Sequence, residues 1–354
     1  MNCQPLFYNG EKILNLLDLN KRKPELFFIT SNRNAGKTTY FLKKFVSEFL
    51  KSGKTTCYLF RYSYELDGDC VGKIFGSVSD LFFSDYIFSQ KKTEKGKLVD
   101  FYIQRKDKTE PERLLGSAIA LSDAANVKRF SHKIKCSYIF FDEFQSEFNS
   151  YLSDEILKFQ SIHKSLARGF GEQVRYLPVI LTGNPVTILN PYYTALGISA
   201  RLNKNVKFLR GNGWVLEQGF NESARDAALD SEFERAFSGA GYENYSIYAA
   251  EGNYFNDSDF GIVKNPGEPG NPVFCIFEND LYYVFENLKK MGKIRIRKSR
   301  GAAGQVCKRD PRSPGNYPLL NFEQKAILKN LFDNNKICFD SLESKDLIFK
   351  ILSY

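Results

Sequence analysis

The sequence predicts an α/β fold in which a parallel sheet carries helices on both faces, and three stretches predict it. Residues 26–30 form a short apolar run, a polar turn follows at 31–38, and residues 39–50 place apolar side chains at helical spacing. Residues 136–141 are continuously apolar and lead into two carboxylates, and residues 176–182 lead into Gly-Asn. Continuous apolar runs are typical of strands buried on both faces, as in parallel sheets.

Length and composition exclude several classes of protein. The chain has 354 residues, which favours two domains, and its hydrophobic content of 43% excludes a disordered chain. No apolar run reaches the length of a membrane span and no signal-peptide pattern is present, so we expect a cytosolic protein with no membrane partner. The seven cysteines include no C-x-x-C pair. Reduced thiols are therefore expected, and a zinc site is not.

The same periodicities predict the other elements of the sheet. A lysine-rich polar turn between two apolar runs indicates a hairpin inserted into the first domain, and a second hairpin is expected to close the sheet. A helix follows the strand that ends in the two carboxylates. In chain order, strands are expected at 56–61, 86–89, 98–104, 114–121, 206–209 and 214–216, and the helix at 153–168.

A change of composition near residue 221 divides the chain into three parts. Residues 1–220 are expected to form the first domain, 221–253 a linker with a helical segment, and 254–354 a smaller α+β domain. Within the last part the patterns predict a hairpin at 273–277 and 281–285, a basic strand at 293–297, and then helix, strand and helix at 322–332, 336–339 and 344–352.

The net charge of +9 is concentrated in one stretch of the last part. Residues 289–312 contain ten basic side chains and one acid, and ten minus one equals the excess of the whole chain. Such a patch suggests contact with backbone phosphates of nucleic acid, although a solvated strand face is the simpler alternative. The candidates for this contact are Lys293, Arg295, Arg297, Lys298 and Arg300.

The turn at 31–38 reads SNRNAGKT and ends in Gly-Lys-Thr. Strand, loop and helix in this order form an anion site, because backbone N–H groups and the helix dipole point at phosphate. Ser31 replaces the first glycine of the P-loop pattern. We expect Lys37 to reach the β- and γ-phosphates of ATP and Thr38 to bind Mg²⁺. The residues expected to hold ATP are Ser31, Asn32, Arg33, Asn34, Ala35, Gly36, Lys37, Thr38 and Thr39.

Polar side chains follow the next two buried strands. Asp142 is expected to bind Mg²⁺ through water, and Glu143 to orient and deprotonate the attacking water. Two solvated acids at a strand end are the alternative. Asn184 is expected to face the γ-phosphate, with a simple Asn-Pro turn as the alternative.

An arginine at the end of the helix at 153–168, or shortly after it, is a candidate to reach the ATP of a neighbouring subunit. Arg168 is the first candidate and Arg175 its competitor, while a cation that meets the helix dipole is the alternative reading of Arg168. Arg33, Lys128 and Arg129 are further candidates for contact with phosphate or with a neighbour.

With these motifs the chain resembles the DNA-packaging ATPases of small podophages with protein-primed linear genomes, compact relatives of the large terminase subunit. The resemblance extends over nearly the whole chain and its motifs are most specific in the first half. It rests on LFYN at 6–9, RNAGKT at 33–38, YLFRY at 58–62, Leu121-Ser122, FDEF at 141–144, LTGN at 181–184, NPYY at 190–193 and the terminal helix, strand and helix.

The resemblance implies an ASCE-type P-loop ATPase that forms a homopentameric ring on the portal of an empty procapsid and translocates double-stranded DNA inward. It places the protein in the host cytoplasm, transiently at the portal vertex, and leaves a packaging RNA open as a partner. Arg168 matches a trans-acting arginine of the family, and Lys128 is similar to a second trans-acting cation. An arginine such as Arg33 is typical of this form of P-loop.

The resemblance also implies an RNase H-like C-terminal domain. A nuclease of that fold needs three carboxylates on its sheet, whereas Glu278, Asp280 and Asp340 lie at strand ends or turns. We therefore expect a vestigial domain that does not cut DNA. The alternatives are a motor with an active, metal-dependent nuclease and a nucleic-acid-binding protein in which ATP is only structural. Glu143 separates the last from a motor, because a pure binder needs no group that activates water.

Overall fold

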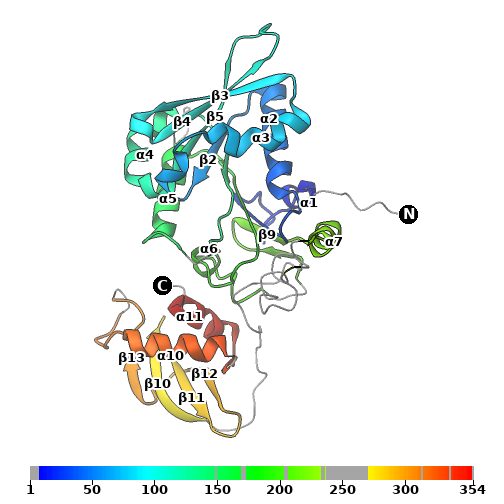
Figure 1. The fold of residues 1–354 in the computed structure, drawn as a ribbon. Helices are drawn as coiled ribbons and strands as arrows, with labels where there is room; N and C mark the ends of the chain where they lie inside the picture. Colours follow the sequence, from blue (N-terminus) through cyan, green and yellow to red (C-terminus); the bar gives the residue numbers. More distant parts are fainter. Residues whose placement is uncertain are drawn as a thin grey trace. The chain divides into compact units, whose positions relative to one another are not determined.

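A computed structural model describes residues 8–147, 150–168, 173–202, 206–232, 236, 270–311, 314–334 and 336–352 (Figure 1). The chain divides into two compact units. The first comprises residues 1–186 and 206–255, and the second comprises 187–205 and 256–354. The division at residues 220 and 253 stays a prediction, and much of the expected linker lies outside the described residues.

The first unit is built on a nine-stranded mixed sheet with a parallel centre, which confirms the predicted fold class. Its strand order is β3-β4-β5-β2-β6-β7-β1-β9-β8. The central run β5-β2-β6-β7-β1-β9 is parallel, and β3, β4 and β8 are antiparallel additions at the edges. The strands are β1 (Leu26–Thr30), β2 (Thr56–Phe60), β3 (Tyr86–Thr93), β4 (Leu98–Arg105), β5 (Arg113–Ala120), β6 (Tyr138–Phe141), β7 (Val179–Gly183), β8 (Phe208–Arg210) and β9 (Trp214–Gln218).

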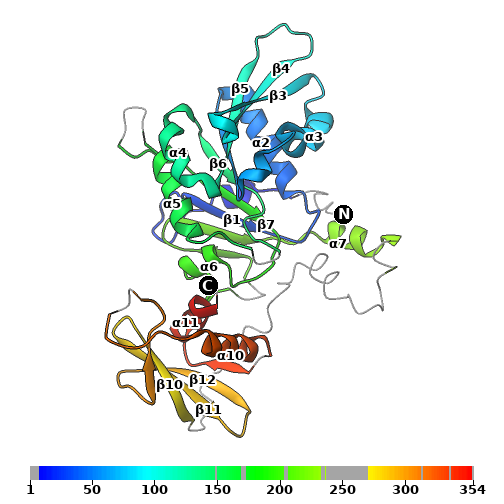
Figure 2. The same ribbon diagram turned by 60° about the vertical axis from the view of Figure 1, so that its left-hand side comes forward.

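Helices cover both faces of this sheet. In Figures 1 and 2, α2 (Lys37–Ser52) and α3 (Cys70–Phe82) lie on one side, and α4 (Ala124–Phe130) and α5 (Glu155–Leu166) lie on the other. Phe41 and Phe45 of α2, Phe75 of α3 and Phe27 and Ile29 of β1 belong to one buried cluster. Because side chains alternate along a strand, the intervening Phe28 faces the opposite layer, where its ring meets that of Phe144.

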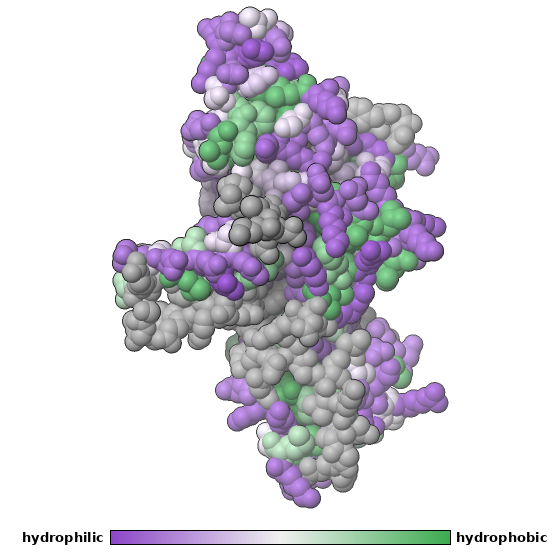
Figure 3. Space-filling model, turned by 90° about the vertical axis from the view of Figure 1, so that its right-hand side faces the viewer, coloured by the Kyte–Doolittle hydropathy of each residue, from purple (hydrophilic) through white to green (hydrophobic). Residues whose placement is uncertain are grey.

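The predicted hairpin insertion is part of the sheet. β3 and β4 pair antiparallel, and β4 pairs in turn with β5, so the insertion extends one edge of the sheet. The end of the unit that carries these strands, at the top of Figure 3, has a mostly hydrophilic surface. The first unit also contains α1 (Glu11–Leu14), α7 (Glu222–Leu229) and short 3-10 turns. No helix within the described part of the chain is both long and apolar enough to cross a membrane.

The second unit has its own five-stranded sheet, of order β13-β10-β11-β12-β14. The predicted hairpin, basic strand and final helix, strand and helix are all present. An RNase H-like topology stays a prediction. The elements are α6 (Pro191–Ala195), β10 (Asn271–Glu278), β11 (Leu281–Leu288), β12 (Lys293–Ser299), β13 (Gln305–Cys307), α10 (Phe322–Asp333), β14 (Ile337–Phe339) and α11 (Leu342–Leu352).

Candidate nucleotide site

The order of the central strands brings the predicted motifs together. β7 lies between β1 and β6, so the loop after β1, the carboxylates after β6 and Asn184 after β7 meet at one edge of the sheet. These segments line a cavity of about 390 Å³, within the size range of small-molecule sites. Its lining residues are Arg33, Asn34, Ala35, Gly36, Lys37, Thr38, Thr39, Asp142, Glu143, Gly183 and Asn184.

The loop at 31–38 turns through two residues in the left-handed region. Gly36 has φ of 88° and directly precedes α2, and Asn34 has φ of 59°. Glycine and asparagine tolerate this conformation at the lowest cost. Ser31 does not have a positive φ, so replacement of the first glycine of the pattern introduces no backbone strain there.

Lys37 is buried beneath the loop. Its Nζ donates to Ser31 Oγ at 2.9 Å, to the carbonyl oxygens of Ser31 at 3.1 Å and Asn32 at 3.2 Å, and to Asn184 Oδ1 at 3.3 Å. Burial lowers the pKa of Lys37 to about 8. The contact with Asn184 places that amide beside the ammonium group. An anion in the cavity would meet both a partly desolvated cation and the amide.

The residues expected to hold Mg²⁺ fit such an ion. The Thr38 hydroxyl donates to Asp142 Oδ2 at 2.7 Å, so a hydroxyl and a carboxylate oxygen already lie next to each other. Thr182 of β7 donates to the other oxygen of Asp142, which holds the carboxylate in place. Oxygen ligands of this kind suit Mg²⁺, which usually takes one or two protein ligands and keeps several waters.

Glu143 has an unusual backbone conformation. Its φ is 53°, and its N–H donates to Asp142 Oδ1 at 3.0 Å. A non-glycine residue in this region costs free energy, and such strain is concentrated at functional sites. Burial and the charge of Asp142 raise the pKa of the Glu143 carboxyl group. A carboxylate with raised proton affinity at the edge of the cavity is suited to accept a proton from water.

Arg61, directly after β2, stabilises the turn that contains Glu143, and the sequence had not indicated this role. Its guanidinium donates to the carbonyl oxygens of Glu143 at 3.3 Å and Phe144 at 2.6 Å. It also donates to Glu155 of α5, and the side chains of Arg61 and Glu155 are only 9% and 1% exposed. One signal was available in the sequence, because a charged residue ends an otherwise apolar strand there.

The phosphate loop is hydrogen-bonded to the segment that follows β9, at Asn221. The Asn32 side-chain amide donates to the carbonyl oxygen of Asn221 and accepts from its N–H, both at 2.9 Å. Asn221 in turn caps α7, because its Oδ1 accepts from Ala224 N at 3.0 Å. Arg33 forms an ion pair with Glu147 of the same chain, close to the two carboxylates. Asn32 therefore has a structural task that the motif pattern did not show.

Arg168 and Arg175 occupy different environments. Arg175 Nη2 donates to the carbonyl oxygen of Leu166 at 3.0 Å, at the end of α5, and its backbone N–H donates to Ala167 O. Arg168 is exposed and lines a separate cavity with Lys128. The geometry therefore favours Arg168 over Arg175 as the arginine that is available to another molecule. Arg129 is also exposed but is not among the described residues that line either cavity.

The basic strand β12 requires a correction. Arg295 is only 8% exposed, and its Nε donates to Glu286 of β11 at 2.8 Å. Arg297 shares Glu286, with Nε to Oε1 at 3.0 Å. The alternation correctly predicted a shared face, but a carboxylate on the neighbouring strand covers it, so Arg295 is not placed to contact DNA. Lys298 and Arg300 are exposed and Lys293 is half-buried.

The three acids considered for a nuclease site have separate surroundings. Glu278 accepts from Arg309 Nη2 at 3.0 Å, and Asp340 accepts from Lys298 N at 2.9 Å and from Ser344 Oγ at 2.6 Å. Asp280 lies in the β10–β11 turn with φ of 61°. Within the described ranges, no three His, Cys, Asp or Glu side chains gather in a way that could hold a metal ion. The expectation of a vestigial domain stays a prediction.

The parallel sheet, the loop between β1 and α2, and the carboxylates at the adjacent strand end define a P-loop nucleoside triphosphatase fold. The chain belongs to the podovirus DNA encapsidation protein (Gp16) family, which matches residues 2–282. The resemblance described from the motifs is thereby confirmed.

Similar proteins agree with this assignment. The DNA packaging protein of Bacillus phage B103 is 24% identical over 241 residues, which cover 68% of this chain and 67% of that protein. The solved Phi-28 gp11 DNA packaging motor has a TM-score of 0.62 at 15% identity and covers 98% of both chains. The bacteriophage Phi-29 viral genome packaging motor assembly has a TM-score of 0.61 at 21% identity, with 98% of this chain and 100% of that chain covered. At these identities the two structures show a shared fold.

Proposed function

We propose that this protein is the ATP-driven motor that translocates double-stranded DNA into a preformed procapsid. The observation that carries the proposal is the convergence of Lys37, Thr38, Asp142, Glu143 and Asn184 at one edge of the sheet. A nucleotide-binding protein needs the lysine and the hydroxyl, but a raised-pKa glutamate at the same cavity serves hydrolysis. The family and the packaging motors of similar fold support DNA as the cargo.

Each residue of the site has a task in this proposal. The loop N–H groups and Lys37 hold the phosphates, and Thr38 and Asp142 hold Mg²⁺, which when bound neutralises charge that develops on the phosphates. Glu143 orients a water molecule and accepts its proton, while Asn184 lies beside Lys37, where it can sense the γ-phosphate. Arg61 holds the turn that carries Glu143.

The proposed assembly is a homo-oligomeric ring, with five subunits expected, on the procapsid portal in the host cytoplasm. Residues 1–220 would form the motor domain and 221–253 the linker. Residues 254–354 would form an RNase H-like domain that binds DNA without cutting it. In that domain Lys293, Arg297, Lys298 and Arg300 remain the candidate contacts. A packaging RNA is a further candidate partner.

The proposal is tested by ATP hydrolysis measured with and without double-stranded DNA and empty procapsids. A motor is expected to hydrolyse ATP slowly alone and several-fold faster when both are present. Single-stranded DNA of the same length without procapsids serves as the control. Turnover that responds to neither DNA nor procapsids would contradict a role in translocation.

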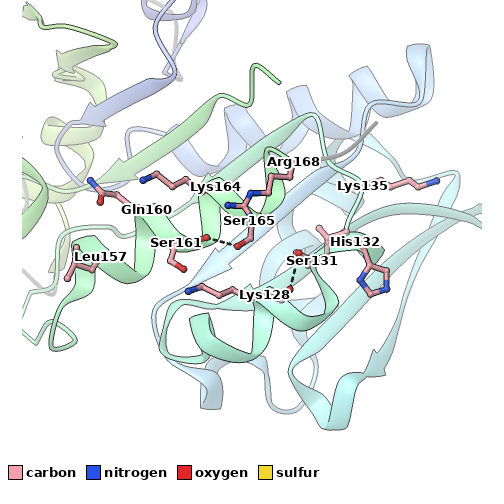
Figure 4. A pocket seen from close by; sticks show the side chains of 11 residues that line it. Lys128, Ser131, His132, Lys135, Leu157, Gln160, Ser161, Lys164, Ser165 and Arg168 are labelled. Atoms are coloured by element: carbon pink, nitrogen blue, oxygen red, sulfur yellow. Dashed lines mark hydrogen bonds between the residues drawn. The ribbon is translucent and has the colours of Figure 1, made fainter. Parts of the chain in front are cut away.

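Arg168→Ala subunits mixed with wild type should lower the activity of the ring by more than their fraction. The physical reason is that each exposed Arg168 is proposed to act on the ATP of a neighbour, and in a ring whose subunits hydrolyse ATP in a coordinated cycle one site without its arginine stops the whole cycle. ATP turnover and packaging are measured against the fraction of variant. Lys158→Ala is the control, because Lys158 lies on α5, the helix that precedes Arg168, but outside the cavity that Arg168 lines (Figure 4). A linear loss of activity with Arg168→Ala would count against a role between subunits.

The affinity for ATP should fall as the pH rises above about 8. The pKa of Lys37 is lowered to about 8, so below that pH the side chain is charged and ready for phosphate, and above it a proton must be taken up on binding. The expected slope approaches a tenfold loss of affinity per pH unit. Calorimetric titrations from pH 7 to 9.5 measure it, with adenosine, which lacks phosphate, as the control ligand. An affinity for ATP that is constant over this range would contradict the role of Lys37.

A further inference from the structure

The hydroxyl group of Ser31 lies beneath the phosphate loop, at the position where the P-loop pattern has its first glycine. Ser31 is only 2% exposed, and it is not among the described residues that line the cavity at the loop. Its backbone N–H donates to the carbonyl oxygen of Gly183 at 3.4 Å, which holds it between the ends of β1 and β7. The side chain is therefore shielded from a ligand in the cavity, and an effect on nucleotide binding must pass through a neighbouring group.

That neighbouring group is the ammonium group of Lys37. It has three N–H groups, and four acceptors of the same chain lie within 3.3 Å of Nζ. Ser31 Oγ is the nearest of them, at 2.9 Å. These acceptors take up the whole donor capacity of the ammonium group, so a phosphate oxygen can bind Lys37 only by displacing one of them.

Ser31 Oγ is the acceptor that a phosphate oxygen can displace most easily. Two of the other three are backbone carbonyl oxygens, which the fold of the loop holds in place. The hydroxyl group can also release Lys37 without losing its own donor bond, because it donates to the carbonyl oxygen of Asn32 at 3.2 Å. A glycine has no side chain, so a loop with glycine at this position leaves one N–H of the lysine to the ligand. Ser31 adds a competing acceptor, and hydrogen bonds from a charged donor are about twice as strong as neutral ones.

We propose that Ser31 is a positioning residue whose hydroxyl group competes with phosphate for Lys37, and so weakens nucleotide binding and speeds nucleotide release. This role rests on the proposed function, because a motor that hydrolyses ATP must release ADP in every cycle. ADP retains the β-phosphate that Lys37 is proposed to reach. As ADP leaves, Ser31 Oγ gives Lys37 an acceptor in place of the phosphate, so the buried ammonium group is not left unpaired.

Ser31→Ala protein is expected to bind ATP about tenfold more tightly than the wild type and to release ADP several-fold more slowly, because the competing hydrogen bond is lost. Calorimetry measures the affinity, and stopped-flow fluorescence of a labelled ADP measures the release. Ser31→Gly lacks the same hydroxyl group and should behave alike. AMP, which ends before the phosphates that Lys37 reaches, should bind equally well to Ser31→Ala and wild type. Ser47→Ala, the same change at an exposed position of α2, is the matched control and should alter the affinity for ATP less than twofold.

A double-mutant cycle separates an action through Lys37 from a general change of the loop. In Lys37→Ala protein, adding Ser31→Ala should leave the affinity for ATP unchanged within twofold, because the hydroxyl group then has no ammonium group to hold. The weaker binding of these two variants is measured by competition with a labelled ATP at high nucleotide concentration. The fluorescence of the buried Trp214 in urea shows that each variant is folded.

The proposal is overturned if Ser31→Ala protein binds ATP with the same or lower affinity than the wild type. It is also overturned if Ser31→Ala tightens binding equally with and without Lys37. Neither outcome bears on the proposed function, which is tested in the wild type by its response to DNA and procapsids.

Discussion

Glu143→Gln protein is expected to bind ATP as tightly as the wild type and to hydrolyse it about 10²–10⁴-fold more slowly. Glutamine keeps the size of the side chain but cannot accept a proton from water. Binding should survive because Lys37, Thr38 and Asp142 carry the contacts with phosphate and Mg²⁺ in the proposal, and none of them is altered. Loss of one negative charge beside Asp142 also removes a repulsion, because that carboxylate contributes to the raised pKa of Glu143.

Two measurements are needed, the dissociation constant for ATP and the single-turnover rate with Mg²⁺. Asp142→Asn is the control at the adjacent position, and it should weaken Mg²⁺-dependent binding as well as turnover, since Asp142 is proposed to hold the ion. Hydrolysis at the wild-type rate by Glu143→Gln protein would show that another group activates the water. It would also revive the alternative of a nucleic-acid-binding protein with structural ATP.

Arg61→Ala is expected to destabilise the first unit by about 3–5 kcal/mol and to abolish turnover in the protein that stays folded. The buried Glu155 loses its cation, and the carbonyl oxygens of Glu143 and Phe144 lose their donor. Urea unfolding followed by fluorescence measures the stability. The single tryptophan, Trp214, is buried in β9 beside β1 and therefore reports on the unit that contains the site.

The double variant Arg61→Met/Glu155→Gln separates stability from positioning. It removes both charges together, so most of the lost stability should return. The amide oxygen that replaces the Glu155 carboxylate can still accept the hydrogen bond that Leu152 N makes there at 2.8 Å. Turnover should stay low, because the turn at Glu143 is still without its donor. Full recovery of turnover in the double variant would mean that Arg61 only stabilises the fold.

The basic strand β12 shows what the period of two can predict and what it cannot. The period of two correctly placed Lys293, Arg295 and Arg297 on one face of a strand. It contained no information about the neighbouring strand, and Glu286 on β11 lies directly opposite Arg295. Cross-strand pairs depend on which strands become neighbours and in what register, so the burial of Arg295 followed only from the assembled sheet.

The sequence by itself determined the loop at 31–38, the carboxylates at 142 and 143 and the amide at 184. These are local signals, since each polar group directly follows a buried strand and parallel strands end at a common edge. Only the tertiary structure decided what depends on distant neighbours. Arg61 meets Glu155 across 94 residues of sequence, and Asn32 meets Asn221 across 189. Arg175 is bound to the end of α5 while Arg168 faces a basic cavity. The physical reason is that burial and pairing are properties of the strand order and the helix packing, which no single segment contains.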